Sequence, residues 1–127
     1  MHNVTVELRG PFFKKSLPGE VDKMMRGAIA EIVNEGERDV AKQLYPGHGL
    51  ITGHYRRSIH GDVLSSRNGV IHDSKVIYGP WLEGVSSRNR STRFKGYSMF
   101  RNAFQRLQRK APGIFRKHVS RMVKGLN

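Results

Sequence analysis

The side chains that could do acid–base or metal chemistry in this sequence are few. Histidine occurs six times, at positions 2, 48, 54, 60, 72 and 118, and cysteine does not occur. Beyond residue 50 the carboxylates are those of Asp62, Asp73 and Glu83. A metal site from His54, His60 and Asp62 is conceivable, and so is a nuclease-type pair of His60 with Asp62 or Asp73. A simpler interpretation places these residues on the exposed face of a sheet.

No sequence motif organises these groups into a recognisable active site. The HExxH spacing of zinc proteases, the G-x-S-x-G nucleophile turn, the P-loop and the dinucleotide fingerprint do not occur. We therefore expect no catalytic residues, no metal site, no cofactor and no enzymatic activity.

A cluster of cations lies in a stretch rich in serine and arginine. Its members are Arg88, Arg90, Arg93 and Lys95. They could neutralise phosphates without reading bases, or they could face an acidic partner protein. Upstream, Tyr78 or Trp81 could stack on a nucleic-acid base. Both rings follow residues typical of a protein core, which favours a structural role for them.

The charge of the chain is asymmetric. The net charge is +13. Residues 1–50 hold seven cations and seven acids, whereas residues 51–127 hold sixteen cations and three acids. A field of that sign attracts polyanions such as nucleic acid, anionic lipid or an acidic protein face. Membrane binding is the least favoured, because the apolar residues of the last helix are ordinary core material.

The elements that position these residues follow from apolar periodicity. Alternation over residues 3–9 predicts a half-buried strand. Helical spacing predicts a helix that begins near residues 16–18 and ends near Leu44, where Pro46 and Gly47 stop it. A strand is expected over residues 57–64, with Asn68–Gly69 as the hairpin turn and residues 70–73 as the returning strand.

The second half continues with a loop and a long helix. Residues 76–78 predict a further short strand, followed by a tight turn at Gly79–Pro80. Residues 85–96 form a basic loop that we expect to be mobile. An amphipathic helix begins near Ser98 and keeps its apolar spacing through Pro112, which predicts one kinked helix or two nearly collinear ones. Phe100 and Phe104 are expected to return the chain to the core.

Together these elements predict one α+β domain spanning residues 1–127. The expected fold is a small antiparallel sheet packed against a long N-terminal helix and a kinked C-terminal helix. A chain of this length can bury a core without disulfides or structural metals. We expect no signal peptide, and no apolar run approaches the roughly 20 residues needed to cross a bilayer.

Three landmarks carry a resemblance to a known family. The first is Thr-Gly-His-Tyr-Arg-Arg-Ser-Ile at 52–59, similar to a Thr-Gly-x-Leu-x-x-Ser-Ile step that follows a long helix. The second is Tyr-Gly-Pro-Trp-Leu-Glu-Gly at 78–84, similar to Tyr-Ala-x-Tyr-Val-Glu-x-Gly. The third is the aromatic-rich approach to the last helix, with Phe94, Phe100 and Phe104. In these features the chain resembles the tail-completion, or head–tail joining, proteins of long-tailed bacteriophages, which are often described as minor tail components.

The chain departs from that family in two places. Glu83 is followed directly by Gly84, without the intervening residue, and residues 93–96 stand where a proline-rich stretch is usual. The residues expected to anchor the base of the basic loop are Tyr78, Pro80, Trp81, Glu83 and Gly84. Glu83 is expected to pair with a nearby arginine or to cap the loop.

The resemblance implies a structural virion protein that has no catalytic role. Such a protein would be a ring-forming subunit of the phage neck, six-fold by analogy, that joins the portal side of the capsid to the tail tube around the DNA channel. Its neighbours would be portal-adaptor and tail-terminator or tail-tube proteins, with nonspecific contact to genomic DNA in the lumen and no membrane contact. It would assemble in the host bacterial cytoplasm. The alternative is a nonspecific nucleic-acid-binding protein that acts through its basic C-terminal half.

Overall fold

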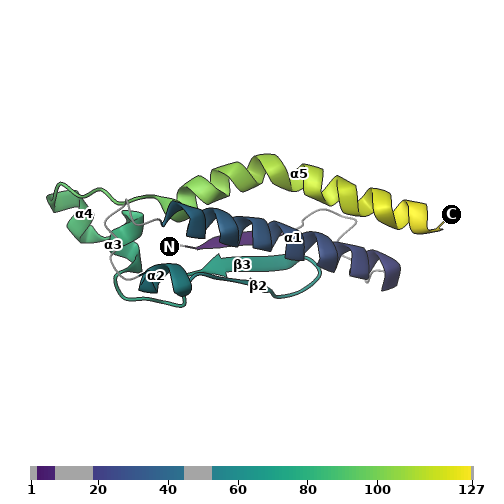
Figure 1. Ribbon diagram of the computed structural model, residues 1–127, viewed down its shortest axis with the longest axis horizontal. Helices are drawn as coiled ribbons and strands as arrows, with labels where there is room; N and C mark the ends of the chain where they lie inside the picture. The colour runs from purple at the N-terminus through teal and green to yellow at the C-terminus, as the bar shows by residue number, and fades with distance from the viewer. Residues whose placement is uncertain (1–2, 8–18, 45–52, 127) are drawn as a thin grey trace.

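The computed structural model describes residues 3–7, 19–44 and 53–126, which form an α+β fold (Figure 1). A three-stranded antiparallel sheet of order β1-β3-β2 packs against α1, and α5 lies along α1. The strands are β1 (Val4–Glu7), β2 (His60–Val63) and β3 (Asn68–His72); the helices are α1 (Gly19–Gln43), α2 (His54–Arg57), α3 (Gly79–Glu83), α4 (Ser87–Ser91) and α5 (Met99–Leu126). The predicted fold class is confirmed.

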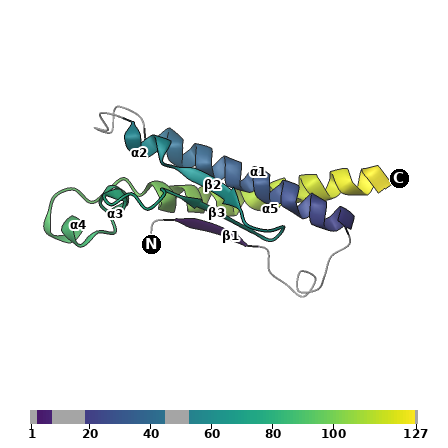
Figure 2. The same ribbon diagram turned by 90° about the horizontal axis from the view of Figure 1, so that it is seen from below.

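The first strand has the alternation that its sequence predicted. Val4 is buried and Val6 is half-buried, whereas Thr5 and Glu7 are exposed. Val4 lies opposite Ile71, so the two residues share the inner face of the sheet. Figure 2 shows the other face, over which no described helix lies. Residues 8 and 9, also predicted for this strand, lie outside the described residues.

Helix α1 confirms the long N-terminal helix and ends at Gln43, one residue before the predicted end. Its predicted start at 16–18 and the stop at 46–47 lie outside the described residues. Gly36 is buried where α1 meets the sheet and α5, because a Cβ there would lie 2.3 Å from Ile71 Cδ1 and 2.7 Å from Leu107 Cδ1. The close approach of three elements explains a glycine that costs the helix about 1 kcal/mol in propensity.

The hairpin between β2 and β3 is present, but two details of its prediction are wrong. β2 begins at His60, because the preceding residues 54–57 form the one-turn helix α2. The chain reverses at 64–67, where the amides of residues 64 and 65 donate to the carbonyl of Asn68. Asn68–Gly69 therefore lies within β3. Gly69 serves packing, since a Cβ there would lie 2.4 Å from Val33 Cγ2.

The predicted strand over residues 76–78 is also wrong. After β3, Ser74 and Lys75 adopt a φ of 60°, in the left-handed region that interrupts extended structure. The Lys75 amide donates to the Asp73 carboxylate at 3.1 Å, which holds this turn. The turn continues through Ile77, which is 96% exposed. Gly79–Pro80, predicted as a tight turn, opens α3 instead.

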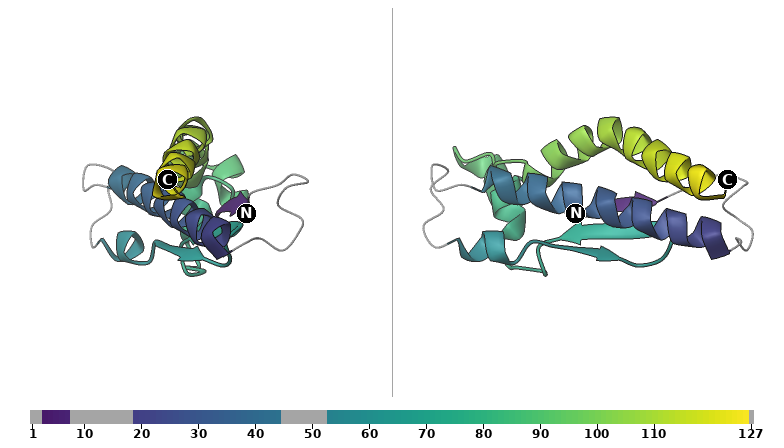
Figure 3. Two further views of the ribbon diagram at one scale, coloured as in Figure 1. Left: turned by 90° about the vertical axis from the view of Figure 1, so that its right-hand side faces the viewer. Right: turned by 45° about the vertical axis from the view of Figure 1, so that its right-hand side comes forward.

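Helix α5 confirms the kinked C-terminal helix. It runs from Met99 to Leu126 with Pro112 inside it, and it bends along its length (Figure 3). Phe100, Ala103 and Leu107 are buried in its first half, as predicted for the core face. Phe104 is 44% exposed, contrary to prediction. It follows Ala103 directly, and one residue turns a helix by about 100°, away from the core.

Candidate assembly surface

The two ends of residues 84–96, the segment that contains the predicted basic loop, are held close together. The amide of Tyr97 donates to the carbonyl of Leu82 at 2.7 Å. Gly84 and Gly96 meet there with φ values of 104° and 92°. A Cβ on Gly96 would lie 2.3 Å from the Cα of Gly84. Glycine at both positions permits the left-handed backbone and the contact, so the two ends of the segment are held together.

Glu83 caps helix α5 from a buried position. It is 5% exposed. Its two carboxylate oxygens accept hydrogen bonds from the amides of Phe100 at 2.8 Å and Arg101 at 3.1 Å. A carboxylate there satisfies amides that lack intrahelical partners and complements the helix dipole. This role was not predicted: the carboxylate caps the helix that follows the loop, and the expected pairing of Glu83 with an arginine stays a prediction.

Asn89 holds the interior of the basic segment. It is 3% exposed. Its amide nitrogen donates to the carbonyls of Trp81 at 3.1 Å and Phe94 at 3.0 Å, and its oxygen accepts from the Ser86 amide at 2.9 Å. The Ser86 hydroxyl in turn accepts from the backbone of α4 and completes a capping box. The segment thus contains a well-anchored short helix, and its mobility stays a prediction.

The aromatic residues near this segment have different surroundings. The ring centroids of Trp81 and Phe94 are 4.9 Å apart, and those of Phe94 and Tyr97 are 5.1 Å apart. Trp81 is half-buried against the core, as the structural interpretation expects. Tyr78 is 43% exposed, and its ring lies 5.7 Å from that of Tyr55. Of the two rings considered for stacking, Tyr78 is the more accessible.

The four predicted loop cations do not play the same part. Arg88, Arg90 and Arg93 are exposed. The ammonium group of Lys95 donates to the carbonyl of Asn89 at 2.8 Å, near the end of α4, where a cation complements the helix terminus. Lys95 therefore stabilises the segment, whereas the three arginines present charge to solvent.

A buried tyrosine–aspartate pair supports the start of α3. The Tyr55 hydroxyl donates to Asp73 at 2.7 Å, and the residues are 2% and 1% exposed. Burial and the hydrogen bond to Asp73 raise the pKa of Tyr55 well above its ordinary value of 10.0. A Cβ on Gly79 would lie 1.9 Å from Asp73 Oδ2, so α3 begins directly against this pair.

Apolar side chains are exposed on the segments that flank α3. Ile77 is 96% exposed and Val85 is 57% exposed. Backbone hydrogen bonds hold the chain at both positions, from the Gly79 amide to the Val76 carbonyl at 3.0 Å and from the Val85 amide to the Pro80 carbonyl at 2.9 Å. Exposed apolar side chains that gather on one surface are candidates for contact with other proteins. We define the candidate assembly surface as Ile77, Tyr78, Val85, Arg88, Arg90 and Arg93. The segment that carries it, with α3 and α4, lies at one end of the molecule (Figure 1).

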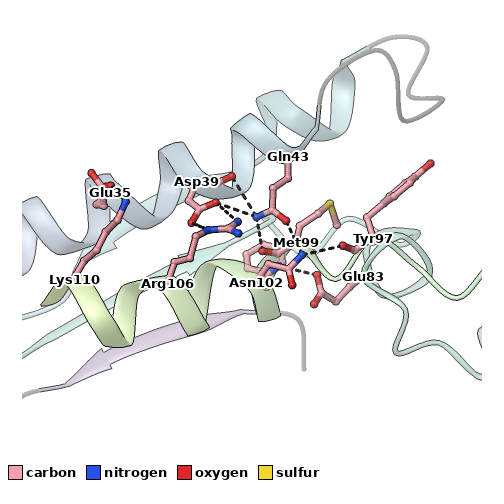
Figure 4. A network of polar contacts seen from close by, with 10 residues as sticks. Glu35, Asp39, Gln43, Glu83, Tyr97, Met99, Asn102, Arg106 and Lys110 are labelled. Carbon is pink, nitrogen blue, oxygen red and sulfur yellow. Dashed lines mark hydrogen bonds and ion pairs between the residues drawn. The ribbon is translucent and has the colours of Figure 1, made fainter.

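A second group of polar residues joins α1 to α5 (Figure 4). Arg106 makes two hydrogen bonds to Asp39, at 2.6 and 2.5 Å, and this carboxylate raises the pKa of Arg106. Lys110 pairs with Glu35 at 2.7 Å. Because Glu35 and Asp39 are four residues apart, as are the two cations, successive turns of the helices are linked.

The ion pairs between α1 and α5 continue beyond Pro112 of α5. Glu31 accepts a hydrogen bond from Lys117 at 2.5 Å and contacts His118 at 3.0 Å. The bonds from Lys117 and then His118 lower the pKa of Glu31 below its ordinary value of 4.5. The acids of α1 therefore engage one side of α5 along much of its length.

The histidines and aspartates of the sheet do not form the sets considered for metal or nuclease chemistry. Asp62 pairs with His72 at 2.7 Å rather than with His60. The other ring nitrogen of His72 accepts the Ser74 amide at 3.0 Å, so both nitrogens are in use. Asp73 is buried in the Tyr55 pair. Among residues 3–7, 19–44 and 53–126, no group of three or more His, Asp or Glu residues could hold a metal ion.

No protein-family model matches the chain, and neither a curated protein nor a solved structure matches it significantly. The resemblance to phage tail-completion proteins therefore rests on the sequence landmarks alone. None of the helices in the described segments is long and apolar enough to cross a membrane.

Sequence reasoning missed the residues that organise this end of the molecule. A signal for Asn89 was present, because Ser86 and Asn89 have the spacing of a capping box. The pairing of Tyr55 with Asp73 had no local signal, since the residues are 18 positions apart: Tyr55 belongs to α2, and Asp73 directly follows β3.

Proposed function

We propose that the protein is a ring-forming structural subunit of a bacteriophage neck, a tail-completion or head–tail joining protein that connects the portal side of the capsid to the tail. The observation that supports this proposal is the set of contacts made by residues 78–84, the second sequence landmark. Glu83 and Gly84 join α3, the basic segment and α5 into a fixed junction, beside which Ile77 and Val85 are exposed. This arrangement suits contact with another macromolecule.

The shape of the molecule supports the same proposal. A closed ring uses heterologous interfaces, in which one patch of a subunit contacts a different patch of the next. The described body is elongated, with α3 and α4 at one end and the C-terminus of α5 at the other (Figure 1). The candidate assembly surface therefore occupies one end of an elongated body, where a subunit or a neighbouring neck protein can reach it.

Electron microscopy of particles assembled without this protein tests the proposed function. We expect filled heads and complete tails that remain separate. Heads joined normally to tails in such particles would refute the proposal.

A complementation experiment tests the assembly surface itself. Ile77→Asp places a charge at an almost fully exposed position, so the purified variant should keep the circular dichroism spectrum and melting temperature of the wild type. It should nevertheless fail to restore the joining of heads to tails. Lys23→Asp, an exposed substitution in the first turns of α1, is the matched control and should restore joining. If Ile77→Asp restores joining as well as the control does, the assignment of this surface is wrong.

A further inference from the structure

Helix α5 carries an unbalanced charge along its whole length. Between Met99 and Leu126 it has eight lysine and arginine residues and no acid. Three of the eight, Arg106, Lys110 and Lys117, are ion-paired with acids of α1. Packing against α1 therefore accounts for these three cations and leaves the others unexplained.

Four of the remaining cations recur at regular intervals along the helix. We call Arg101, Arg109, Arg116 and Lys124 the outer row, and all four are exposed. They are eight, seven and eight residues apart, so they repeat at intervals of about 10–12 Å over about 35 Å of the helix. Arg109 and Arg116 are nearly in line, and the row winds by about 140° around the helix axis from Arg101 to Lys124. None of the four forms an ion pair with the described residues. In Figures 1 and 3, no other described helix or strand covers the side of α5 that faces away from α1.

We infer that the outer row is a binding surface for the phosphate backbone of nucleic acid. A linear polyanion with evenly repeated charges matches a row of cations at regular intervals. Three of the four are arginines, and a single guanidinium group can donate two parallel hydrogen bonds to the oxygens of one phosphate. The exposed residues between them include Gln105, Gln108 and Ser120, which are neutral and polar. The surface has no acid to repel phosphates and no feature that would select a base sequence.

Two other polyanions fit this side of α5 less well. A membrane-surface helix needs a free apolar face to insert between lipids, but Phe100, Ala103 and Leu107 are buried in the core. A protein partner is usually held by aromatic or aliphatic anchors that become buried at the centre of the interface. The large exposed apolar residues of α5 are Phe104 and Val123, which lie towards opposite ends of the row rather than clustering at its centre. Nucleic acid needs neither feature.

The inference assigns nucleic-acid contact to the helix rather than to Arg88, Arg90 and Arg93. It does not depend on the proposed neck function, because the purified chain should bind DNA whether or not it joins heads to tails. The two clusters can be compared with equal changes in charge. One triple variant is Arg109→Gln, Arg116→Gln, Lys124→Gln, and the other is Arg88→Gln, Arg90→Gln, Arg93→Gln.

The test measures binding to a labelled DNA duplex of about 20 base pairs, roughly twice the length of the row. Fluorescence anisotropy is recorded between about 50 and 200 mM salt. The helix triple should bind on the order of 10- to 100-fold more weakly than the wild type at the low end of this range. Its slope of log K against log salt should be shallower by about 2.7, from about 0.9 per lost phosphate contact. The loop triple should stay close to the wild type.

Three results would overturn the inference. They are no binding by the wild type at about 50 mM salt, a loop triple that loses as much affinity as the helix triple, and stronger binding to phosphatidylserine vesicles than to DNA. All six replaced side chains are exposed, so both variants should retain the wild-type melting temperature. A helix variant with Arg109→Lys and Arg116→Lys, which keeps the charge, should recover most of the DNA affinity. Failure to recover it would also count against a phosphate-backbone contact.

Discussion

Replacing Glu83 with glutamine should destabilise the isolated protein, because the two oxygens of this buried carboxylate hold the first turn of α5. They accept from the amides of Phe100 and Arg101 at 2.8 and 3.1 Å. Glutamine keeps one acceptor but presents an NH₂ group to the other amide, so one bond is lost and a buried donor is left unsatisfied. Hydrogen bonds to charged groups contribute about 1.5–3 kcal/mol each. We expect Glu83→Gln to lower the free energy of unfolding by about 2–4 kcal/mol.

Urea denaturation followed by circular dichroism measures this change directly. In a domain of this size the melting temperature should also fall by roughly 10 °C. Glu20→Gln is the control, since Glu20 lies in the first turn of α1 but is exposed and should contribute less than about 1 kcal/mol. A loss of under about 0.5 kcal/mol in Glu83→Gln, the range of ordinary surface substitutions, would refute the capping role. Glu83 would then have to be explained by contacts with a partner.

Three further predictions concern the packing and the pH dependence. Tyr55→Phe removes the hydroxyl donor to buried Asp73 and should cost about 1–3 kcal/mol in urea denaturation. Gly79→Ala should cost a similar amount, because its Cβ would lie 1.9 Å from that carboxylate. Gly113→Ala, with no atom within 4 Å of its Cβ, should instead stabilise α5 by up to about 1 kcal/mol. The pKa of Glu31 is lowered from 4.5 in the folded protein, so its stabilisation is present above that value and is lost as the pH falls through the folded pKa. The difference in stability between wild type and Glu31→Gln should therefore shrink as the pH is lowered below 4.5; a difference that stays constant throughout acidification would contradict this account.

The parts of the fold that were predicted correctly are those with a local periodic signal. Apolar spacing gave α1 and α5, including the continuation of α5 through Pro112, and alternation gave β1. The errors fall between residues 57 and 79, where local signals compete with packing. Gly69 has the sequence of a hairpin turn but is needed beneath α1. Ser74 and Lys75 are not residue types that favour a positive φ. The turn is held by the Asp73 carboxylate two residues before Lys75 and by the Ser74 hydroxyl, which donates to the distant Ser58 carbonyl at 2.8 Å.

The candidate site was predicted in part, and for a similar reason. The 78–84 landmark singled out Glu83 and Gly84, whose residue types reflect a cap and a close backbone contact. The sequence did not reveal the hydrogen-bond donors of Glu83, because their amides belong to a helix that begins 16 residues later. Asn89 binds backbone carbonyls, which every residue offers, so residue types could not identify its acceptors.

The contacts of the carboxylates determine which charges of the chain remain exposed. At least eight of the described carboxylates have partners inside the molecule. Seven of them are Asp22 with Arg26, Glu31 with Lys117, Glu35 with Lys110, Asp39 with Arg106, Asp62 with His72, Asp73 with Tyr55, and Glu83 with the α5 amides. Glu37 accepts the Gly61 amide of β2 at 2.8 Å, which occupies a donor on this edge strand.

These contacts also change the interpretation of the neutral first half. Most acids of residues 1–50 are paired with cations of α5 or with backbone amides. Arg38 and Lys42 of α1 therefore remain exposed, although the net charge of residues 1–50 is zero. Both line a depression of about 590 Å³ together with Arg56. The acids of its lining, Glu35 and Asp39, are ion-paired with Lys110 and Arg106, which also line it. The positive surface therefore extends from the second half of the sequence onto α1. Removing acids should accordingly weaken folding, whereas removing cations from the outer row should weaken binding and leave folding intact.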